Sequence, residues 1–309
     1  MPGLSTHYLF GIKALKNIKG SKLHALIKEY PCVYALGQQG PDLLFYYPSY
    51  IKNGNIGVRM HEERTADFFH SMLKYIDKYS ENERERNVLI VYFAGFLGHY
   101  VLDRTFHPYV YAFSTEGCTL KQHGRHFKIE ADIDAYFLKN IKKTHPGFFK
   151  GGKTLALSPW EENAIIHMLR NVIFYTYGEK LGRRRLKITL CIMRMVHALL
   201  RDKRGIKKRL ITSVEAKMLG FQLLGGLVPE YRENKKSKAT LNISRDNWKS
   251  PWEDEERNKS VPDMLRAAKE EYTGILMELD SLLAGLGKDK KKFIDFIGCY
   301  SYKTGRLVL

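Results

Sequence analysis

The hydrophobic positions along this chain recur at helical spacing. Apolar residues return every three or four residues in several stretches, and no long stretch alternates with a period of two. The pattern therefore predicts an all-α protein. The expected helices span residues 60–79, 85–103, 126–141, 160–180, 185–201 and 260–285.

Clusters of glycine and proline interrupt this pattern and mark the turns between the predicted helices. These clusters are "GQQGPD" (37–42), "KNGNIG" (52–57), "THPGFFKGG" (144–152) and "LLGGLVPE" (223–230). The chain changes character near residue 150, where histidines become rare and basic runs begin. We therefore expect two regions: residues 1–150, which carry the candidate chemistry, and residues 151–309, a basic helical region packed on the first.

A polar stretch, residues 231–260, has no helical period and is predicted to be an ordered loop. It contains "RDNWKSPWEDEERNKS", with Trp248 and Trp252. Two tryptophans in such a loop could close over a ligand, or they could anchor the loop to the core. We favour the second interpretation.

The longest apolar run, Val88 to Gly98, leads directly into His99. It is too short to cross a bilayer, so it predicts a buried helix. The start of the sequence has neither an apolar segment of signal-peptide length nor a small-residue cleavage site. We therefore expect a cytoplasmic protein.

Composition and charge narrow the classes of partner. The chain has 309 residues, of which 44% are hydrophobic and 27% charged, which is typical of a globular protein and argues against disorder. The net charge is +18. Such a charge suits nucleic acid or anionic lipid head groups, although solvated helix faces would produce the same pattern. The basic runs are Arg183 to Arg185, Arg201 to Arg209, Lys235 to Lys238 and Lys288 to Lys292.

The four cysteines are far apart in the sequence. They lack the paired spacing of a thiolate zinc site or a disulfide framework, so we expect free thiols in the core.

The stretch "FLGHYVLDRTFHPY" carries the strongest chemical signal. It places His99, Asp103 and His107 four residues apart, so that on a helix all three would lie on nearly one face. Imidazoles and a carboxylate are costly in such apolar surroundings unless something pairs them. A second stretch, "GRHFKIEADID", places His126 and Glu130 one helical turn apart.

Three further positions stand beside apolar or aromatic residues: His7, Asp42 and His61. Each alone suits a structural histidine or a helix-capping aspartate. Together with the residues above they make eight imidazole and carboxylate groups without a thiolate, which is the ligand set of a catalytic zinc site. Eight ligands exceed the needs of one tetrahedral ion, so more than one metal ion is expected.

In this order, the motifs resemble the bacterial zinc-dependent phospholipase C family, which includes alpha-toxin and phosphatidylcholine-preferring phospholipase C. The resemblance covers residues 5–140 and rests most on "GHYVLD". It implies an all-helical bundle of the phospholipase C and nuclease type with a multinuclear zinc site, to which this chain adds C-terminal helices.

The resemblance also implies a distribution of ligands. Asp42, His61, His99 and Asp103 would hold one zinc ion, and His107, His126 and Glu130 a second. His7 would hold a third, with Asp103 bridging two ions, and Asp42 would also act in catalysis near the attacking water. His123 is a spare candidate beside His126. Supporting or solvated groups would be Glu62, Glu63, Asp132 and Asp134.

One departure from the family concerns the third ion. In secreted members the mature N-terminal residue binds it, whereas this chain begins Met-Pro-Gly, with Pro2 five residues before His7. We therefore expect two or three zinc ions.

The expected chemistry follows from the metals. Two zinc ions about 3.5 to 4 Å apart can share a hydroxide and clamp the attacking and leaving oxygens of a phosphodiester. The expected reaction is that of a phospholipase C, with zinc-bound hydroxide cleaving a glycerophospholipid on its glycerol side. The aromatic stretch "LLFYYPSY", with Phe45, Tyr46, Tyr47 and Tyr50, would contact the substrate or pack in the core.

Two alternative functions remain. Fungal single-strand nucleases use a related fold and zinc site, and the basic second half would suit a polyanion. The other alternative is a metal-stabilised binding protein without turnover. The oligomeric state is not indicated by the sequence.

Overall fold

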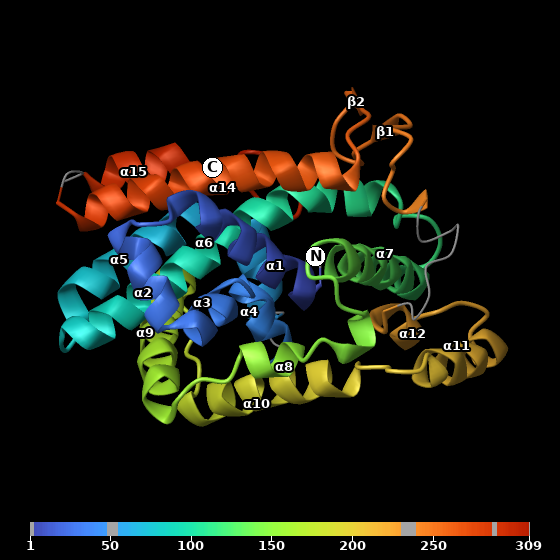
Figure 1. Ribbon diagram of the computed structural model, residues 1–309, viewed down its shortest axis with the longest axis horizontal. Coiled ribbons are helices and arrows are strands. Elements are labelled where there is room, and N and C mark those ends of the chain that lie inside the picture. The colour runs from blue at the N-terminus through green and yellow to red at the C-terminus, as the bar shows by residue number, and fades with distance from the viewer. Residues whose placement is uncertain (1–2, 48–54, 230–238, 286–288, 309) are drawn as a thin grey trace.

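The protein is described here from a computed structural model, which covers residues 3–47, 55–229, 239–285 and 289–308. Helices dominate these residues, as the sequence predicts (Figure 1). The first half contains α1 (Leu4–Leu15), η1 (Lys16–Ile18), α2 (Lys22–Glu29), α3 (Pro31–Gly37), η2 (Gly40–Tyr46), α4 (Ile56–Glu62), α5 (Thr65–Tyr79), α6 (Glu83–Ala112), α7 (Thr119–Asn140) and η3 (Pro146–Phe148). The second half contains α8 (Gly151–Thr154), α9 (Pro159–Tyr177), α10 (Arg183–Leu199), α11 (Ile206–Met218), α12 (Leu224–Leu227), β1 (Trp248–Lys249), β2 (Glu256–Arg257), α14 (Val261–Leu283) and α15 (Lys290–Ile297).

Helix α6 forms the centre of the core. The apolar run predicted to be a buried helix lies within it, and the side chains from Val88 to Asp103 are buried without interruption. Asn82 caps its N-terminus by accepting a hydrogen bond from the amide of Glu85 at 2.9 Å. The helix continues beyond the predicted end at residue 103, and this extension places His107 on the same helix as His99 and Asp103.

Helices α3 and α6 cross at two glycines, Gly37 and Gly95. A Cβ atom on Gly37 would lie 2.3 Å from the carbonyl oxygen of Tyr92, and one on Gly95 would lie 2.4 Å from that of Tyr34. Only glycine permits such an approach between two backbones. The contact holds the end of α3, and with it the segment leading into η2, against α6.

The second half of the chain packs around this centre. Helix α14 lies against α6 and α1, while α9 lies against α5 and α6. Helix α10 runs along the opposite edge, and α12 lies against α7 (Figure 1). Across the residues the structure describes, we find no helix with the length and apolar character needed to span a membrane.

The polar stretch predicted to be a loop contains a short antiparallel pair, β1 and β2, in its described part from residue 239. Trp248 anchors it: its indole N–H donates to the carbonyl of Lys259 at 3.1 Å, and its ring meets Tyr109 edge to face. Trp252 instead meets Tyr111, at 5.0 Å between ring centroids. The basic run Lys235 to Lys238 lies outside the described residues.

All four cysteines are free, as predicted, but none is fully buried in the core: Cys32 and Cys299 are half-buried, and for the other two the prediction is wrong. Cys118 and Cys191 are exposed. Cys118 precedes the first residue of α7, and Cys191 lies on the solvent side of α10, so both thiols contact water rather than the core.

Candidate metal centre

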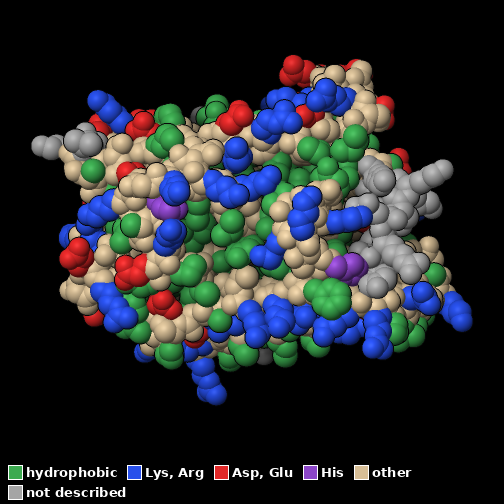
Figure 2. Space-filling model, in the orientation of Figure 1, with side chains coloured by type: hydrophobic (Ala, Val, Ile, Leu, Met, Phe, Trp, Pro, Cys, Tyr) green, Lys and Arg blue, Asp and Glu red, His purple; other side chains and the backbone are tan. Residues whose placement is uncertain are grey.

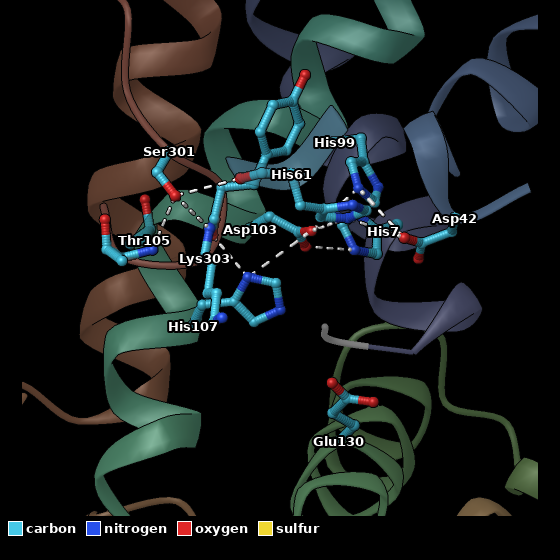
Figure 3. A network of polar contacts seen from close by, with 12 residues as sticks. His7, Asp42, His61, His99, Asp103, Thr105, His107, Glu130, Ser301 and Lys303 are labelled. Atoms are coloured by element: carbon cyan, nitrogen blue, oxygen red, sulfur yellow. Dashed lines mark hydrogen bonds and ion pairs between the residues drawn. The ribbon is translucent and has the colours of Figure 1, made fainter. Parts of the chain in front are cut away.

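Within the described residues, two groups of side chains could each hold a metal ion. In each group the ligand atoms all lie within 4.8 Å of one another. Figure 3 shows the imidazoles of His7, His61 and His99 gathered around the carboxylate of Asp103, with Glu130 on the neighbouring helix α7. The first group is Asp42, His61, His99 and Asp103, and the second is His107, His126 and Glu130.

The first group depends on the glycine that opens η2. Gly40 has a φ of +48°, which favours glycine, and a Cβ atom there would lie 2.3 Å from Cδ2 of His99. The bare backbone at this position lets η2 lie directly over the imidazole. As a result, the Asp42 carboxylate lies beside two imidazoles: its Oδ1 is 3.7 Å from Nε2 of His99 and 3.2 Å from Nε2 of His61.

Backbone carbonyls orient three of the histidines. The Nδ1 nitrogens of His61, His99 and His107 lie 2.6, 3.2 and 2.6 Å from carbonyl oxygens. Since a carbonyl only accepts, each Nδ1 donates, which leaves Nε2 as the nitrogen that carries the lone pair when the ring is neutral. This is the arrangement found around metal-bound histidines. The accepting carbonyls belong to Gly57, Gln38 and Tyr302, respectively.

Asp103 lies at the meeting point of the imidazoles. One of its oxygens is 3.1 Å from Nε2 of His7, and the other is 3.0 Å from Nε2 of His99 and 3.5 Å from Nε2 of His61. The rings of His7 and His99 stack, with centroids 4.3 Å apart. His7 therefore faces Asp103 from the side of α1, outside both ligand groups.

The electrostatics favour a bound cation. Burial raises the pKa of the Asp103 carboxyl, but the imidazoles of His99 and His107 outweigh it and hold that pKa well below its usual range. Burial lowers the pKa of His7, His107 and His126, which favours the neutral form of these rings. Neutral imidazole and ionised carboxylate are the protonation states that bind metal.

His61 differs from the other histidines. Burial lowers its pKa, but hydrogen bonds to Asp103 and Asp42 raise the pKa by more than burial lowers it, and the net result is a pKa of about 9. A proton on His61 therefore balances the two carboxylates when no other cation is present. A metal ion between the same groups would supply that positive charge instead.

A direct test of fit is whether buried polar atoms lack partners. Among the described residues, Nε2 of His99, both ring nitrogens of His7, Oδ1 of Asp42 and both oxygens of Asp103 are buried and have no hydrogen-bond partner beyond the ion-pair contacts among themselves and with His61. Such atoms are costly in a protein interior unless a ligand satisfies them. Imidazole nitrogens and carboxylate oxygens are donors that suit zinc, so the residues fit this ion.

The second group joins α6 to α7. Nε2 of His126 lies 2.6 Å from Oε1 of Glu130, one turn further along α7. His107 faces them from α6, with its ring centroid 5.8 Å from that of His126. Tyr111 packs against both rings and also against Trp252, so the loop after residue 239 reaches the edge of this group.

The remaining acidic candidates lie outside both ligand groups. Asp132 and Asp134 are buried rather than solvated. Asp134 accepts hydrogen bonds from the amide and hydroxyl of Thr6, at 2.8 and 2.5 Å, and so fixes the start of α1, which carries His7. Asp132 pairs with Lys128. Glu62 and Glu63 form ion pairs with Lys303 and Arg59, and His123 is exposed.

The aromatic stretch divides between site and core. Phe45 is 42% exposed and stacks on His61, with ring centroids 5.1 Å apart and planes 19° from parallel. Tyr46 is half-buried and Tyr47 is buried, where its hydroxyl accepts from the amide of Gly182. Tyr50 lies outside the described residues.

Sequence reasoning missed the groups that orient the ligands. Gln38, Gly57 and Tyr302 act through backbone carbonyls, which any residue type can supply, so no composition or spacing signal reveals them. Gly40 did carry a signal, since it lies within a glycine and proline cluster beside Asp42. Tyr302 lies almost two hundred positions from His107, and only the fold relates them.

Comparison with known proteins identifies one family. A sequence model of the family described as zinc dependent phospholipase C matches residues 6–172, which is more than half of the chain. All eight candidate ligands lie within the matched residues. No curated protein and no solved structure matches the chain significantly.

Proposed function

This chain belongs to the zinc-dependent phospholipase C family, and from that premise we propose that it is a phospholipase C that cleaves glycerophospholipids on the glycerol side of the phosphate. The observation that carries the proposal is the convergence of buried imidazole nitrogens and carboxylate oxygens at Asp103, whose ion-pair contacts are with one another. Such a cluster is unfavourable on its own and favourable around a divalent cation.

We assign the ligands as follows. Asp42, His61, His99 and Asp103 would hold one zinc ion, and His107, His126 and Glu130 would hold a second. His7, which faces Asp103, would contribute to a third position. Zinc in these positions would acidify a bound water and neutralise the charge of a phosphodiester.

The chain's own residues have separate tasks in this reaction. Asp42 is 13% exposed, whereas Asp103 is fully buried, so Asp42 is the carboxylate that an attacking water can reach. Its oxygen can accept a proton from that water and orient it. The carbonyls behind His61, His99 and His107 keep those rings fixed while the substrate enters and leaves.

The exposed ring of Phe45 is the group best placed to contact the lipid. The ring stacks on His61 and is still 42% exposed, so a bound lipid can bury the remaining apolar surface. An aromatic ring beside the reacting phosphate suits the glycerol portion and the first methylene groups of a phospholipid.

Metal analysis of the purified protein combined with a substrate panel tests this function. The panel contains phosphatidylcholine, a chromogenic soluble phosphodiester and single-stranded DNA. We expect two or three zinc ions per chain, release of phosphocholine, and loss of hydrolysis when a chelator removes the metal. Less than one zinc per chain after zinc-replete expression would contradict the metal assignment.

The same panel separates the alternatives. Cleavage of single-stranded DNA without release of phosphocholine would identify a nuclease, for which the exposed Arg183 to Arg185 at the start of α10 would be a suitable contact. Full zinc occupancy without turnover of any substrate would identify a metal-stabilised binding protein.

A further inference from the structure

Helix α11 (Ile206–Met218) turns its apolar residues outward. Ile206, Leu210, Val214 and Met218, which we call the α11 ladder, recur every four residues along one side of the helix. Their exposed fractions are 60, 65, 48 and 77%, respectively. Isolated exposed apolar residues are common, but a continuous row along a helix marks an interaction surface.

The opposite side of α11 is charged and buried, which reverses the usual amphipathic arrangement. Glu215 accepts hydrogen bonds from the amides of Leu223, Leu224 and Gly225, at 3.0, 2.6 and 3.1 Å. Lys208 donates from Nζ to the carbonyl of Val228 at 2.6 Å. These bonds tie the charged side of α11 to the start and end of α12.

Asp202 fixes the N-terminal end of α11 in the same way. It is buried, and its carboxylate accepts from the amides of Arg204, Ile206 and Lys208. Carboxylates that accept several backbone N–H groups form strong, directional bonds. The orientation of α11 is therefore set by bonded charged groups, and the α11 ladder faces outward as a consequence of that bonding.

Basic residues accompany the ladder. Lys207 and Lys217 lie on the exposed side of α11 between its apolar residues, and Arg209 lies at the edge. Lys203 and Arg204 precede the helix and are also exposed. The two acidic residues of this segment, Asp202 and Glu215, are buried and bonded to backbone amides. Figure 2 shows Lys and Arg side chains gathered along the edge formed by α10 and α11, with hydrophobic side chains among them.

We infer that the α11 ladder and its basic neighbours form a docking surface for an anionic lipid bilayer. An apolar row flanked by lysine and arginine is the pattern of a helix that lies in the membrane interface, with the apolar side chains among the acyl chains and the cations at the phosphates. The inference rests on the proposed function in that the substrate is a membrane lipid.

Charge complementarity favours a bilayer over a second copy of the chain. In a twofold interface each surface faces its own copy, so Lys207 and Lys217 would meet cations of the partner. Like charges brought together in this way oppose association. A phosphate-bearing surface instead attracts every exposed charge on this side of α11.

The docking surface is connected to the metal centre. Helix α12, which Glu215 holds, packs against α7 at two glycines: a Cβ atom on Gly124 would lie 1.8 Å from the carbonyl of Gln222, and one on Gly226 would lie 2.7 Å from that of Gly124. His126 follows Gly124 by two residues on α7. The membrane-facing helix therefore sits one helix away from the second ligand group.

Vesicle sedimentation tests the docking surface. Full-length protein is mixed with vesicles of phosphatidylcholine, with and without phosphatidylserine. The double variant Leu210→Ser/Met218→Ser should partition onto the mixed vesicles at least about tenfold more weakly than the parent protein. In the variant Lys207→Gln/Arg209→Gln, partitioning onto vesicles with phosphatidylserine should weaken about fivefold for each charge removed. Partitioning onto vesicles of phosphatidylcholine alone should not change.

A matched control carries the same chemical change elsewhere. Met277 on α14 and Phe296 on α15 are 49 and 57% exposed, and Met277→Ser/Phe296→Ser should bind like the parent. The single variant Leu210→Trp should show a blue shift of tryptophan emission on mixed vesicles, and Met277→Trp should show none. Both readouts are independent of enzymatic activity.

The outcomes distinguish the inference from the proposed function. Parent protein that does not bind mixed vesicles, or an α11 variant that binds them like the control, overturns the inference. So does a concentration-dependent dimer of the parent that Leu210→Ser/Met218→Ser abolishes. Hydrolysis of the soluble phosphodiester should be equal in all variants, and its absence from the parent would contradict the proposed function alone.

Discussion

The imidazole of His107 donates from Nδ1 to the backbone carbonyl of Tyr302 at 2.6 Å. The backbone amide of Tyr302 in turn donates to the carbonyl of His61 at 3.0 Å. The side chain of Tyr302 is buried and meets the ring of His61 edge to face. A segment near the C-terminus, well beyond the family match, therefore supports one histidine of each ligand group.

Removal of this segment should weaken zinc binding. A chain ending at Gly298 lacks the carbonyl that orients His107, and loss of such a partner costs roughly 10- to 100-fold in metal affinity or activity. Competition with a zinc chelator measures the affinity. A chain ending at Lys303 keeps Tyr302 and should bind zinc nearly as the full protein does. Equal affinities in both truncated chains would contradict a supporting role for Tyr302.

Asp103→Asn should abolish turnover of every substrate. The carboxylate faces three imidazoles, so its neutral replacement removes the negative charge that would balance an ion in the first ligand group and one beside His7. We expect activity to fall by more than the roughly 100-fold that follows from removing a group that only hydrogen-bonds to a metal ligand. Zinc content and hydrolysis of the soluble phosphodiester measure the effect.

The matched control is Asp132→Asn, because Asp132 is also buried but pairs with Lys128 outside both ligand groups. It should keep zinc and activity and lose only stability. An Asp103→Asn protein with full zinc content and activity would show that this carboxylate serves packing.

The metal-free protein should become less stable as the pH rises from 6.5 to about 9. The pKa of His61 is raised to about 9 in the folded state, through its bonds to Asp103 and Asp42 against the opposing effect of burial. Because the folded protein binds this proton more tightly than the unfolded chain, the proton stabilises the fold, fully so at pH values below 6.5, the pKa of the unfolded chain. This stabilisation disappears as the pH rises through about 9, the pKa of the folded protein. The expected loss is on the order of 2 to 3 kcal/mol.

Thermal unfolding at pH 6.5 and pH 9, with and without zinc, measures this effect. Zinc held by the same groups would supply the positive charge in place of the proton on His61, so the zinc-loaded protein should keep its stability at pH 9. The metal-free His61→Asn variant should lack this part of the pH dependence. A metal-free parent protein whose melting temperature is the same at both pH values would contradict the prediction.

The helical fold and the grouping of candidate residues could be predicted from the sequence because both depend on helical spacing. Periodicity reports which side of a helix is buried, and the four-residue spacing of His99, Asp103 and His107 places them on one side of α6 without knowledge of the rest. Helix α11 escaped prediction because its apolar residues face outward and its buried side is charged. The contact of Tyr302 with His107 escaped it because a backbone carbonyl leaves no trace in residue type.

Phe45→Ala should weaken the use of lipid substrates without disturbing the metals. The ring stacks on His61 but supplies no ligand atom, and its Cδ1 atom lies against Gly57, whose carbonyl orients the same histidine. Loss of the exposed ring removes apolar contact with bound lipid, so KM for phosphatidylcholine should rise about tenfold, which corresponds to partial burial of one aromatic side chain. The value of kcat and the zinc content should stay close to those of the parent, because the carbonyl of Gly57 remains. Phe45→Leu, which keeps most of the apolar surface, should recover most of the affinity. If instead Phe45→Ala lowered kcat and zinc content together, the ring would serve to hold His61 in place, and the lipid contact would have to be sought elsewhere.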